Sequence, residues 1–389
     1  MKKLVLLVTL VAVLAIVAAC APAPTPAPTA APPTAAPKPA SSSSSVASSV
    51  APVVPTVAPT AAPKPTEVPK PVVLDKFQFR LNWTLYGEHA GFFVARDKGF
   101  YKEEGLDVEI LEGSGSTTVL GLVANNTNPV AYVDAATMMR GVANGMPVKA
   151  VGVTLQQSPM AFIYRADAAR PTKVEEIKGS RIAITAGDAS LQIFTAFMGK
   201  LGMKVDDVNM IVVSNPAAKE AAVIDKKADA LLGYFMDQGP RMQLQTGIKM
   251  GWTRLYDING TTTLSSAIVV NNDWLKDAKN QDILKRFLRA SQRGWQYTAD
   301  NRDEAAEIFM KNAPSFNKEI SLLEINGTMT IMRTEKTKGK AIGWSSIDDW
   351  KDTQDLLVTF GAPPLKPQTD LNVYFTNDFL SDVPYMLKK

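Results

Sequence analysis

The chain has 389 residues, a formal net charge of +4, and only one cysteine and one histidine. Basic and acidic side chains nearly balance and form no basic stripe, which argues against nucleic acid as a partner. A single histidine and a single cysteine cannot build a multi-histidine or zinc-finger metal site, and one cysteine forms no disulfide within the chain. We therefore expect no metal and no cofactor.

Residues 1–20 have the three parts of an export signal. Lys2 and Lys3 are its positive part, and the apolar run 4–17 is shorter than the roughly 20 residues of a membrane-spanning helix. The run ends in Val-Ala-Ala before Cys20, which resembles the bacterial lipobox. We predict a signal peptide over 1–19 and a lipidated Cys20, which anchors the protein to the extracytoplasmic face of the cell membrane by lipid alone. An ordinary cleavable signal with a chance cysteine is the alternative.

Residues 20–71 consist mainly of proline, alanine, serine, threonine and valine and carry few charges. Such a segment cannot bury enough apolar surface to offset its chain entropy, and its prolines favour an extended backbone. It is predicted to be a disordered stalk, open to glycosylation, that follows the lipidated cysteine.

From residue 72 onward, strand-like and helix-like patterns alternate. Expected strands lie at 77–81, 108–110, 130–133, 148–153 and 161–164, and expected helices at 91–101, 117–124 and 135–144. This alternation is typical of α/β proteins with parallel sheets and helices on both faces.

A similar scheme restarts at residue 181. Expected strands lie at 181–184, 210–213 and 230–234, with helices at 191–201 and 217–226, and C-terminal helices at 283–299, 304–312 and 348–360. The apolar spacing of the C-terminal helices suggests that they pack onto the first part of the fold. The repeated scheme predicts two α/β lobes that meet at the carboxyl ends of their strands, where open sheets bind ligands.

Several segments resemble one known family. Leu-Asn-Trp-Thr at 81–84 and His-Ala-Gly-Phe-Phe-Val-Ala at 89–95 are similar to periplasmic thiamine-pyrimidine-binding proteins and to yeast thiamine-pyrimidine synthase. Further matches lie at 98–101, 104–108, 145–148, 177–183 and 227–230. The wider clan includes sulfonate, nitrate and taurine binders.

The resemblance implies a two-lobed type II periplasmic-binding-protein fold with a ligand cleft between the lobes. Lobe one is expected over 72–158 plus 265–389 and lobe two over 159–264, with crossings near 157–161 and 262–266. The resemblance also implies a monomer that closes on its ligand and then docks on the permease of an ABC importer.

The first candidate ligand-binding residues are Trp83, Tyr86 and His89, which follow the first expected strand. Aromatic rings offer flat surfaces that suit an aromatic heterocycle, and the histidine coincides with one that is associated with substrate chemistry in the yeast enzyme. Packing of the rings in the core and a structural histidine are the alternatives.

The turn at 113–118 offers glycines, hydroxyls and free helix-start N–H groups, so Ser114, Gly115 and Ser116 are candidates, with helix capping as the alternative. The remaining candidates lie at expected helix starts, at the first crossing and at a strand end: Thr137, Met138, Gln157, Asp188, Ser190, Tyr234 and Asp237. Asp188 is also placed to cap the helix that follows it.

These candidates favour a substrate-binding lipoprotein that captures an aromatic heterocyclic vitamin or precursor. Riboflavin is preferred over a thiamine-type aminopyrimidine, because the small turn at 113–118 leaves room for a larger ligand. The stalk also resembles lipoproteins of filamentous phototrophic bacteria, in which a riboflavin binder of this clan exists.

A sulfonate or taurine binder is a third possibility, disfavoured by an aromatic cleft with an acidic Asp188. An enzyme is not expected, because the yeast relative has a cysteine-rich iron-binding segment, whereas Cys20 is the only cysteine here.

Overall fold

The computed structural model describes residues 73–168 and 171–381. The predicted signal peptide, the stalk and Cys20 lie outside the described residues. Within the described part of the chain, no helix is both long and apolar enough to cross a membrane.

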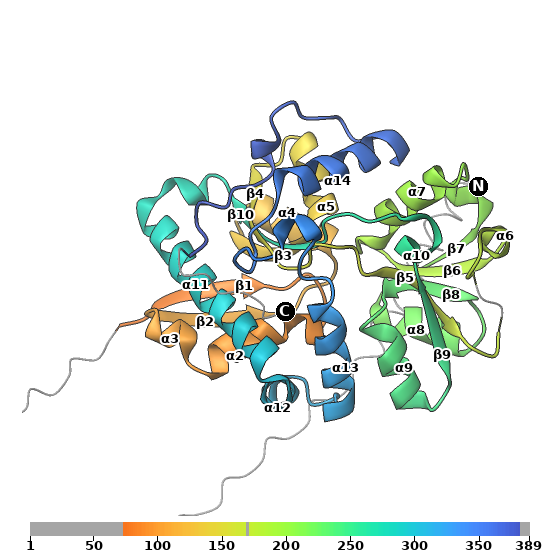
Figure 1. Ribbon diagram of the computed structural model, residues 1–389, viewed down its shortest axis with the longest axis horizontal. Coiled ribbons are helices and arrows are strands. Elements are labelled where there is room, and N and C mark those ends of the chain that lie inside the picture. The colour runs from red at the N-terminus through yellow and green to blue at the C-terminus, as the bar shows by residue number, and fades with distance from the viewer. Residues whose placement is uncertain (1–72, 169–170, 382–389) are drawn as a thin grey trace, which may run out of the picture. The chain divides into compact units, whose positions relative to one another are not determined.

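Two five-stranded sheets form the framework (Figure 1). The first has the order β2-β1-β3-β10-β4, with β1 (Asp75–Arg80), β2 (Leu106–Leu111), β3 (Val130–Asp134), β4 (Val148–Val153) and β10 (Ser266–Asn271). The second has the order β7-β6-β8-β5-β9, with β5 (Met160–Arg165), β6 (Arg181–Thr185), β7 (Asn209–Val213), β8 (Ala230–Tyr234) and β9 (Met250–Arg254).

Both sheets are mixed, which corrects the expectation of parallel sheets. In the first sheet β1 pairs parallel with β2 and β3, whereas β10 pairs antiparallel with β3 and β4. In the second sheet β6 pairs parallel with β7 and β8, whereas β5 pairs antiparallel with β8 and β9. In each case the antiparallel strand is the one that enters from the other sheet. Strands β9 and β10 were not predicted.

The helices of the first sheet are α2 (Ala90–Asp97), α3 (Phe100–Glu103), α4 (Ser116–Ala124), α5 (Ala135–Ala143), α11 (Ala278–Asp300), α12 (Arg302–Asn312), α13 (Lys318–Met329) and α14 (Ile347–Phe360). Those of the second are α6 (Val174–Ile177), α7 (Ser190–Lys200), α8 (Pro216–Ile224), α9 (Gln238–Thr246) and α10 (Leu255–Asn259). The single helix expected over 91–101 is divided into α2 and α3 because Gly99 has a φ of 80°, which ends the first helix. Helices α6, α9, α10 and α13 were not predicted.

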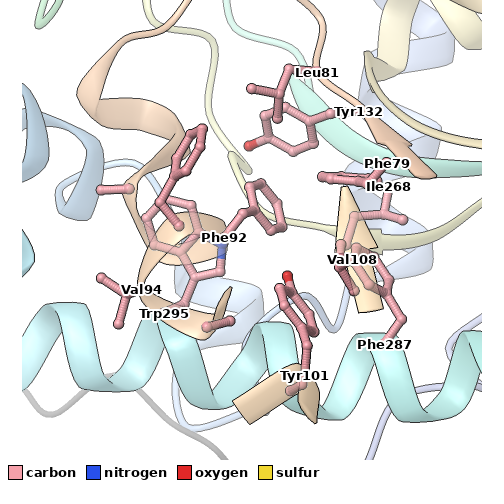
Figure 2. Close-up of a cluster of buried hydrophobic side chains, with 14 of the residues drawn as sticks. Phe79, Leu81, Phe92, Val94, Tyr101, Val108, Tyr132, Ile268, Phe287 and Trp295 are labelled. Atoms are coloured by element: carbon pink, nitrogen blue, oxygen red, sulfur yellow. The ribbon is translucent and has the colours of Figure 1, made fainter. Parts of the chain in front are cut away.

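Side chains of the first sheet alternate between two buried layers. Tyr132 and Ile268 point to one face and Val133 and Val269 to the other. On the first face, Phe79, Phe92, Tyr132, Phe287 and Trp295 fill the space between the sheet and α11 (Figure 2).

Two glycines let α2 and α11 approach closely. A Cβ on Gly91 would lie 2.2 Å from the Cδ2 atom of Trp295, and one on Gly294 would lie 2.3 Å from the carbonyl oxygen of Gly91.

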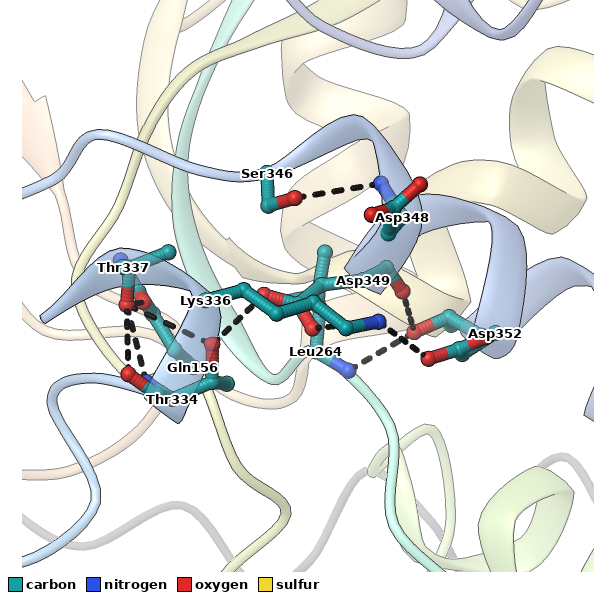
Figure 3. Close-up of polar contacts among 10 residues, drawn as sticks. Gln156, Leu264, Thr334, Lys336, Thr337, Ser346, Asp348, Asp349 and Asp352 are labelled. Atoms are coloured by element: carbon teal, nitrogen blue, oxygen red, sulfur yellow. Dashed lines mark hydrogen bonds and ion pairs between the residues drawn. The ribbon is translucent and has the colours of Figure 1, made fainter.

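Two segments, 154–159 and 260–265, connect the sheets, and the C-terminal region holds both of them (Figure 3). In the first, the Gln156 amide donates to the carbonyl oxygen of Trp344 at 2.7 Å and accepts from the Thr337 hydroxyl. In the second, the backbone N–H of Leu264 donates to the Thr353 hydroxyl at 2.9 Å. The C-terminal region therefore holds both connections by hydrogen bonds.

Candidate ligand-binding site

A cavity of about 50 Å³ lies where the carboxyl ends of β1, β6 and β8 meet, as expected for an open α/β sheet. The residues that line it from the first sheet's side are Asn82, Trp83, Tyr86, Glu88 and Ser116. Those from the second sheet's side are Met160, Asp188, Ala189, Ser190, Lys219, Leu232, Gly233, Tyr234, Asp237 and Gln238.

Seven of the candidates from the sequence line this cavity: Trp83, Tyr86, Ser116, Asp188, Ser190, Tyr234 and Asp237. Asp188 also contacts the first residue of α7, since one of its carboxylate oxygens accepts the backbone N–H of Ser190 at 2.9 Å. The Ser116 hydroxyl accepts the N–H of Asp134 at 3.1 Å, so it connects α4 to the end of β3.

The other six candidates lie elsewhere. Ser114 is exposed, Met138 is fully buried in the core, and the Gln157 amide donates to the carbonyl oxygen of Arg333 at 2.7 Å. Gly115 has a φ of 119° and packs so closely that a Cβ would lie 2.4 Å from the carbonyl oxygen of Gly187.

His89 is fully buried behind the cavity wall, and Thr137 lines a second, larger hollow of about 990 Å³. A direct ligand contact by any of these six residues stays a prediction.

A buried ion pair forms one wall of the cavity. The Lys219 ammonium lies 3.3 Å from an Asp188 carboxylate oxygen and donates to the carbonyl oxygen of Leu232 at 3.0 Å. The same ammonium lies 5.2 Å from the centre of the Trp83 ring, within the range of a cation–π contact. Lys219 therefore holds the Trp83 ring in place, and the Asp188 carboxylate balances the charge of the Lys219 ammonium.

A second charged group joins the two sides of the cavity next to Tyr86. The Tyr86 hydroxyl donates to a Glu220 carboxylate oxygen at 3.1 Å, and Glu220 also pairs with Arg241. The Arg241 guanidinium lies 4.6 Å from the centre of the Tyr86 ring. Burial raises the pKa of Tyr86 well above its usual value, so its hydroxyl stays protonated and donates.

Three buried polar atoms on the cavity wall have no hydrogen-bond partner among the described residues: Glu88 Oε2, Asp237 Oδ1 and Gln238 Nε2. Burial raises the pKa of Glu88 well above its usual value, and the Asp237 charge raises it further. Burial and the Glu324 carboxylate likewise raise the pKa of Asp237. Unpaired buried polar groups are unfavourable by about 1–3 kcal/mol each, so such atoms around a cavity indicate a polar ligand or ordered water.

Four polar residues of the cavity wall were not among the candidates from the sequence: Asn82, Glu88, Lys219 and Gln238. Asn82 and Glu88 are direct neighbours of Trp83 and His89, so the signal was present in the same segment. Lys219 and Gln238 lie on α8 and α9, and α9 was not predicted. Their place on the wall follows from the sheet order, which the local pattern does not reveal.

Asp134, at the start of α5, gives a pH-dependent contribution to stability. Its carboxylate accepts the N–H of Thr137 at 2.8 Å, and burial raises its pKa to about 6. Because the pKa is higher in the folded than in the unfolded state, this contribution is complete below about pH 4 and is lost as the pH rises through about 6.

Between pH 4 and 7, we expect the free energy of unfolding of the wild type to fall by up to about 3 kcal/mol more than that of Asp134→Asn, in which the asparagine retains the cap. Urea unfolding across this range measures the difference. Asp370→Asn is the matched control, because Asp370 accepts the N–H of Asn372 at the molecular surface. Equal pH slopes for wild type and Asp134→Asn contradict the expectation.

The described residues contain no group of three or more histidine, cysteine, aspartate or glutamate side chains arranged to hold a metal ion.

Solved structures share this architecture. The periplasmic aliphatic sulphonate binding protein SsuA from Escherichia coli is 14% identical with a TM-score of 0.54, covering 72% of this chain and 85% of that one. The periplasmic nitrate-binding protein NrtA from Synechocystis PCC 6803 is 16% identical with a TM-score of 0.55, covering 79% and 87%. The predicted two-lobed periplasmic-binding-protein fold is therefore confirmed.

Sequence relatives include binding proteins and an enzyme. The riboflavin-binding protein RibY of Chloroflexus aurantiacus is 25% identical over 82% of this chain and 91% of its own length. The formylaminopyrimidine-binding protein of Halalkalibacterium halodurans is 21% identical over 73% and 87%. The 4-amino-5-hydroxymethyl-2-methylpyrimidine phosphate synthase THI11 of Saccharomyces cerevisiae is 24% identical over 64% and 74%.

A model of the NMT1/THI5-like family matches residues 87–305, a span that includes most of the cavity residues and both connections between the sheets. The resemblance inferred from the segments at 81–84 and 89–95 is thereby confirmed. The chain belongs to the NMT1/THI5-like family.

Proposed function

We propose that this protein is the substrate-binding lipoprotein of an ABC importer and captures an aromatic heterocyclic vitamin, with riboflavin as the preferred ligand. The observation that carries the proposal is the combination on one cavity wall of aromatic rings with unpaired, buried hydrogen-bonding atoms. Trp83 and Tyr234 offer flat apolar surfaces, and Glu88, Asp237 and Gln238 offer directional contacts. This pairing suits a flat ring system with polar edges.

The sequence relatives support riboflavin as the preferred ligand. A riboflavin-binding relative aligns over 82% of the chain. A thiamine-type aminopyrimidine is the second candidate, because a formylaminopyrimidine-binding relative aligns over 73% of the chain.

Charge argues against a sulfonate. The Lys219 ammonium is already paired with Asp188, and the other ionisable side chains on the wall are tyrosines and the acidic Glu88 and Asp237. An anion in the cavity would lie next to these acidic groups, and no unpaired cationic side chain lines the described cavity wall to balance its charge.

We further propose that Cys20 carries a lipid anchor and that residues 20–71 are a stalk, which places the binding domain on the extracytoplasmic face of the membrane. A binding role in place of catalysis is supported by the cysteine content. Cys20 is the only cysteine, so the chain has no cysteine-rich segment for the iron of the yeast enzyme.

A thermal-shift experiment tests the proposed ligand. Riboflavin at about a hundredfold excess over its Kd is expected to raise the Tm by about 5 °C or more, because it binds the folded state alone. Thiamine, 4-amino-5-hydroxymethyl-2-methylpyrimidine, taurine and an alkylsulfonate are the comparison ligands. A rise with a sulfonate and none with riboflavin or the pyrimidine contradicts the proposal.

A further inference from the structure

Behind the cavity, a chain of hydrogen bonds starts at the only histidine. The backbone N–H of Tyr86 points to His89 Nδ1 at 3.2 Å, and His89 Nε2 lies 2.8 Å from Asn82 Oδ1. A backbone N–H can only donate, so Nδ1 is the acceptor and the ring proton sits on Nε2. Burial lowers the pKa of His89 to about 3, which keeps the ring neutral in this tautomer.

This tautomer fixes the orientation of Asn82. Because Asn82 Oδ1 accepts from His89, its amide nitrogen faces Glu88, with Nδ2 at 3.5 Å from Glu88 Oε1. The backbone of Asn82 is held as well, since its carbonyl oxygen accepts the N–H of Gly115 at 2.9 Å. Asn82 therefore presents a fixed donor to one oxygen of Glu88.

This series of hydrogen bonds ends at Glu88 on the cavity wall. Glu88 is 1% exposed, and its second oxygen, Oε2, has no partner among the described residues. Burial raises the pKa of Glu88 most, and Asp237 and Asp134 raise it further, whereas the hydrogen bond from Asn82 lowers it. Burial outweighs the contact with Asn82 and favours the protonated acid, which offers a hydrogen-bond donor and an acceptor side by side.

We propose that Glu88 selects the ring edge of the ligand: it pairs with a flat, uncharged heterocycle that presents an N–H group beside an acceptor, and His89 and Asn82 are its positioning residues. The inference rests on the proposed function and deepens it. A flavin has such an edge, where a ring N–H lies between two carbonyl groups. A sulfonate presents acceptors alone and would leave the acceptor side of Glu88 unpaired.

The test compares riboflavin with 3-methylriboflavin, in which a methyl group replaces the proton of that ring N–H. The wild-type chain is expected to bind riboflavin about tenfold more tightly, since one buried group loses its partner in the methylated ligand. Flavin fluorescence titration gives both Kd values. Equal affinities for the two flavins in the wild type overturn the proposal without any variant.

Two substitutions of Glu88 separate hydrogen bonding from charge. Glu88→Gln keeps a donor and an acceptor and is expected to bind riboflavin within about threefold of the wild type and to keep the preference. Glu88→Leu is expected to weaken riboflavin binding by about tenfold or more and to abolish the preference. If Glu88→Gln loses as much affinity as Glu88→Leu, the ligand requires a carboxylate and the uncharged-edge proposal is wrong.

Asn82→Asp tests the positioning role. An aspartate still accepts from His89 but cannot donate to Glu88, so the acid turns its own O–H toward residue 82 and the preference for riboflavin is lost. Asn128→Asp is the control, because buried Asn128 accepts from Arg80 in the first sheet, away from the cavity residues. A preserved preference in Asn82→Asp overturns the positioning role.

Failure of the proposed function and failure of the Glu88 assignment give different experimental results. If the wild-type chain binds neither flavin, the proposed function fails, and the assignment of Glu88 fails with it. If the wild type binds riboflavin and the Glu88 variants match it in affinity and preference, the assignment of Glu88 alone is wrong.

Discussion

Replacing Trp83 with alanine is expected to weaken riboflavin binding by about 30-fold or more, which corresponds to about 2 kcal/mol. The Trp83 ring lies half-buried on the cavity wall, held by the Lys219 ammonium at 5.2 Å from its centre. Alanine removes the flat surface on which we propose that the ligand ring packs, and it removes the aromatic ring next to the Lys219 ammonium. Flavin fluorescence titration measures the loss.

Two variants define the origin of this effect. Trp83→Phe keeps an aromatic surface and is expected to retain most of the affinity. Trp252→Ala removes a tryptophan that is 42% exposed and does not line the cavity, so its affinity should equal that of the wild type. Unchanged binding by Trp83→Ala shows that the ring is a packing residue and contradicts its role as a ligand contact.

The substitution Trp295→Ala is expected to lower the free energy of unfolding by about 3–5 kcal/mol. Trp295 is 1% exposed and packs edge-on against Phe92, with ring centres 5.6 Å apart (Figure 2). The indole nitrogen has no hydrogen-bond partner among the described residues, so the loss comes from the cavity left between α2 and α11. Urea unfolding followed by circular dichroism measures it.

The exposed Trp252 again provides the control, since Trp252→Ala is expected to change stability by less than about 1 kcal/mol. Trp295→Phe should lose less than Trp295→Ala, because a smaller void remains. A loss below about 1 kcal/mol for Trp295→Ala would mean that α2 and α11 do not depend on this ring.

Much of the fold could be predicted from local patterns, because each strand and helix buries a periodic set of side chains. Strands β4 and β8 begin and end where the apolar runs 148–153 and 230–234 do. The mixed character of the sheets could not be predicted in this way. It arises because β5 and β10 enter from the other sheet, and the direction of pairing depends on contacts between distant residues.

Cavity residues that directly follow a strand in the sequence could be predicted. Cavity residues on separate helices were harder to predict. Trp83 and Tyr86 follow β1 directly, and Tyr234 ends β8, so the rule for open sheets places them. His89 is buried behind this wall and meets Asn82, which its position in the sequence alone does not indicate. Lys219 and Gln238 line the cavity because of how the second sheet is ordered, and this order is a property of the whole lobe.

A crystal structure of the chain with riboflavin tests the central claim most directly. The account predicts the flavin ring in the cavity between the two sheets, packed against Trp83, with its N–H edge within hydrogen-bond distance of Glu88 Oε2. Riboflavin bound outside this cavity, or a bound flavin whose polar edge points away from Glu88, Asp237 and Gln238, would contradict it.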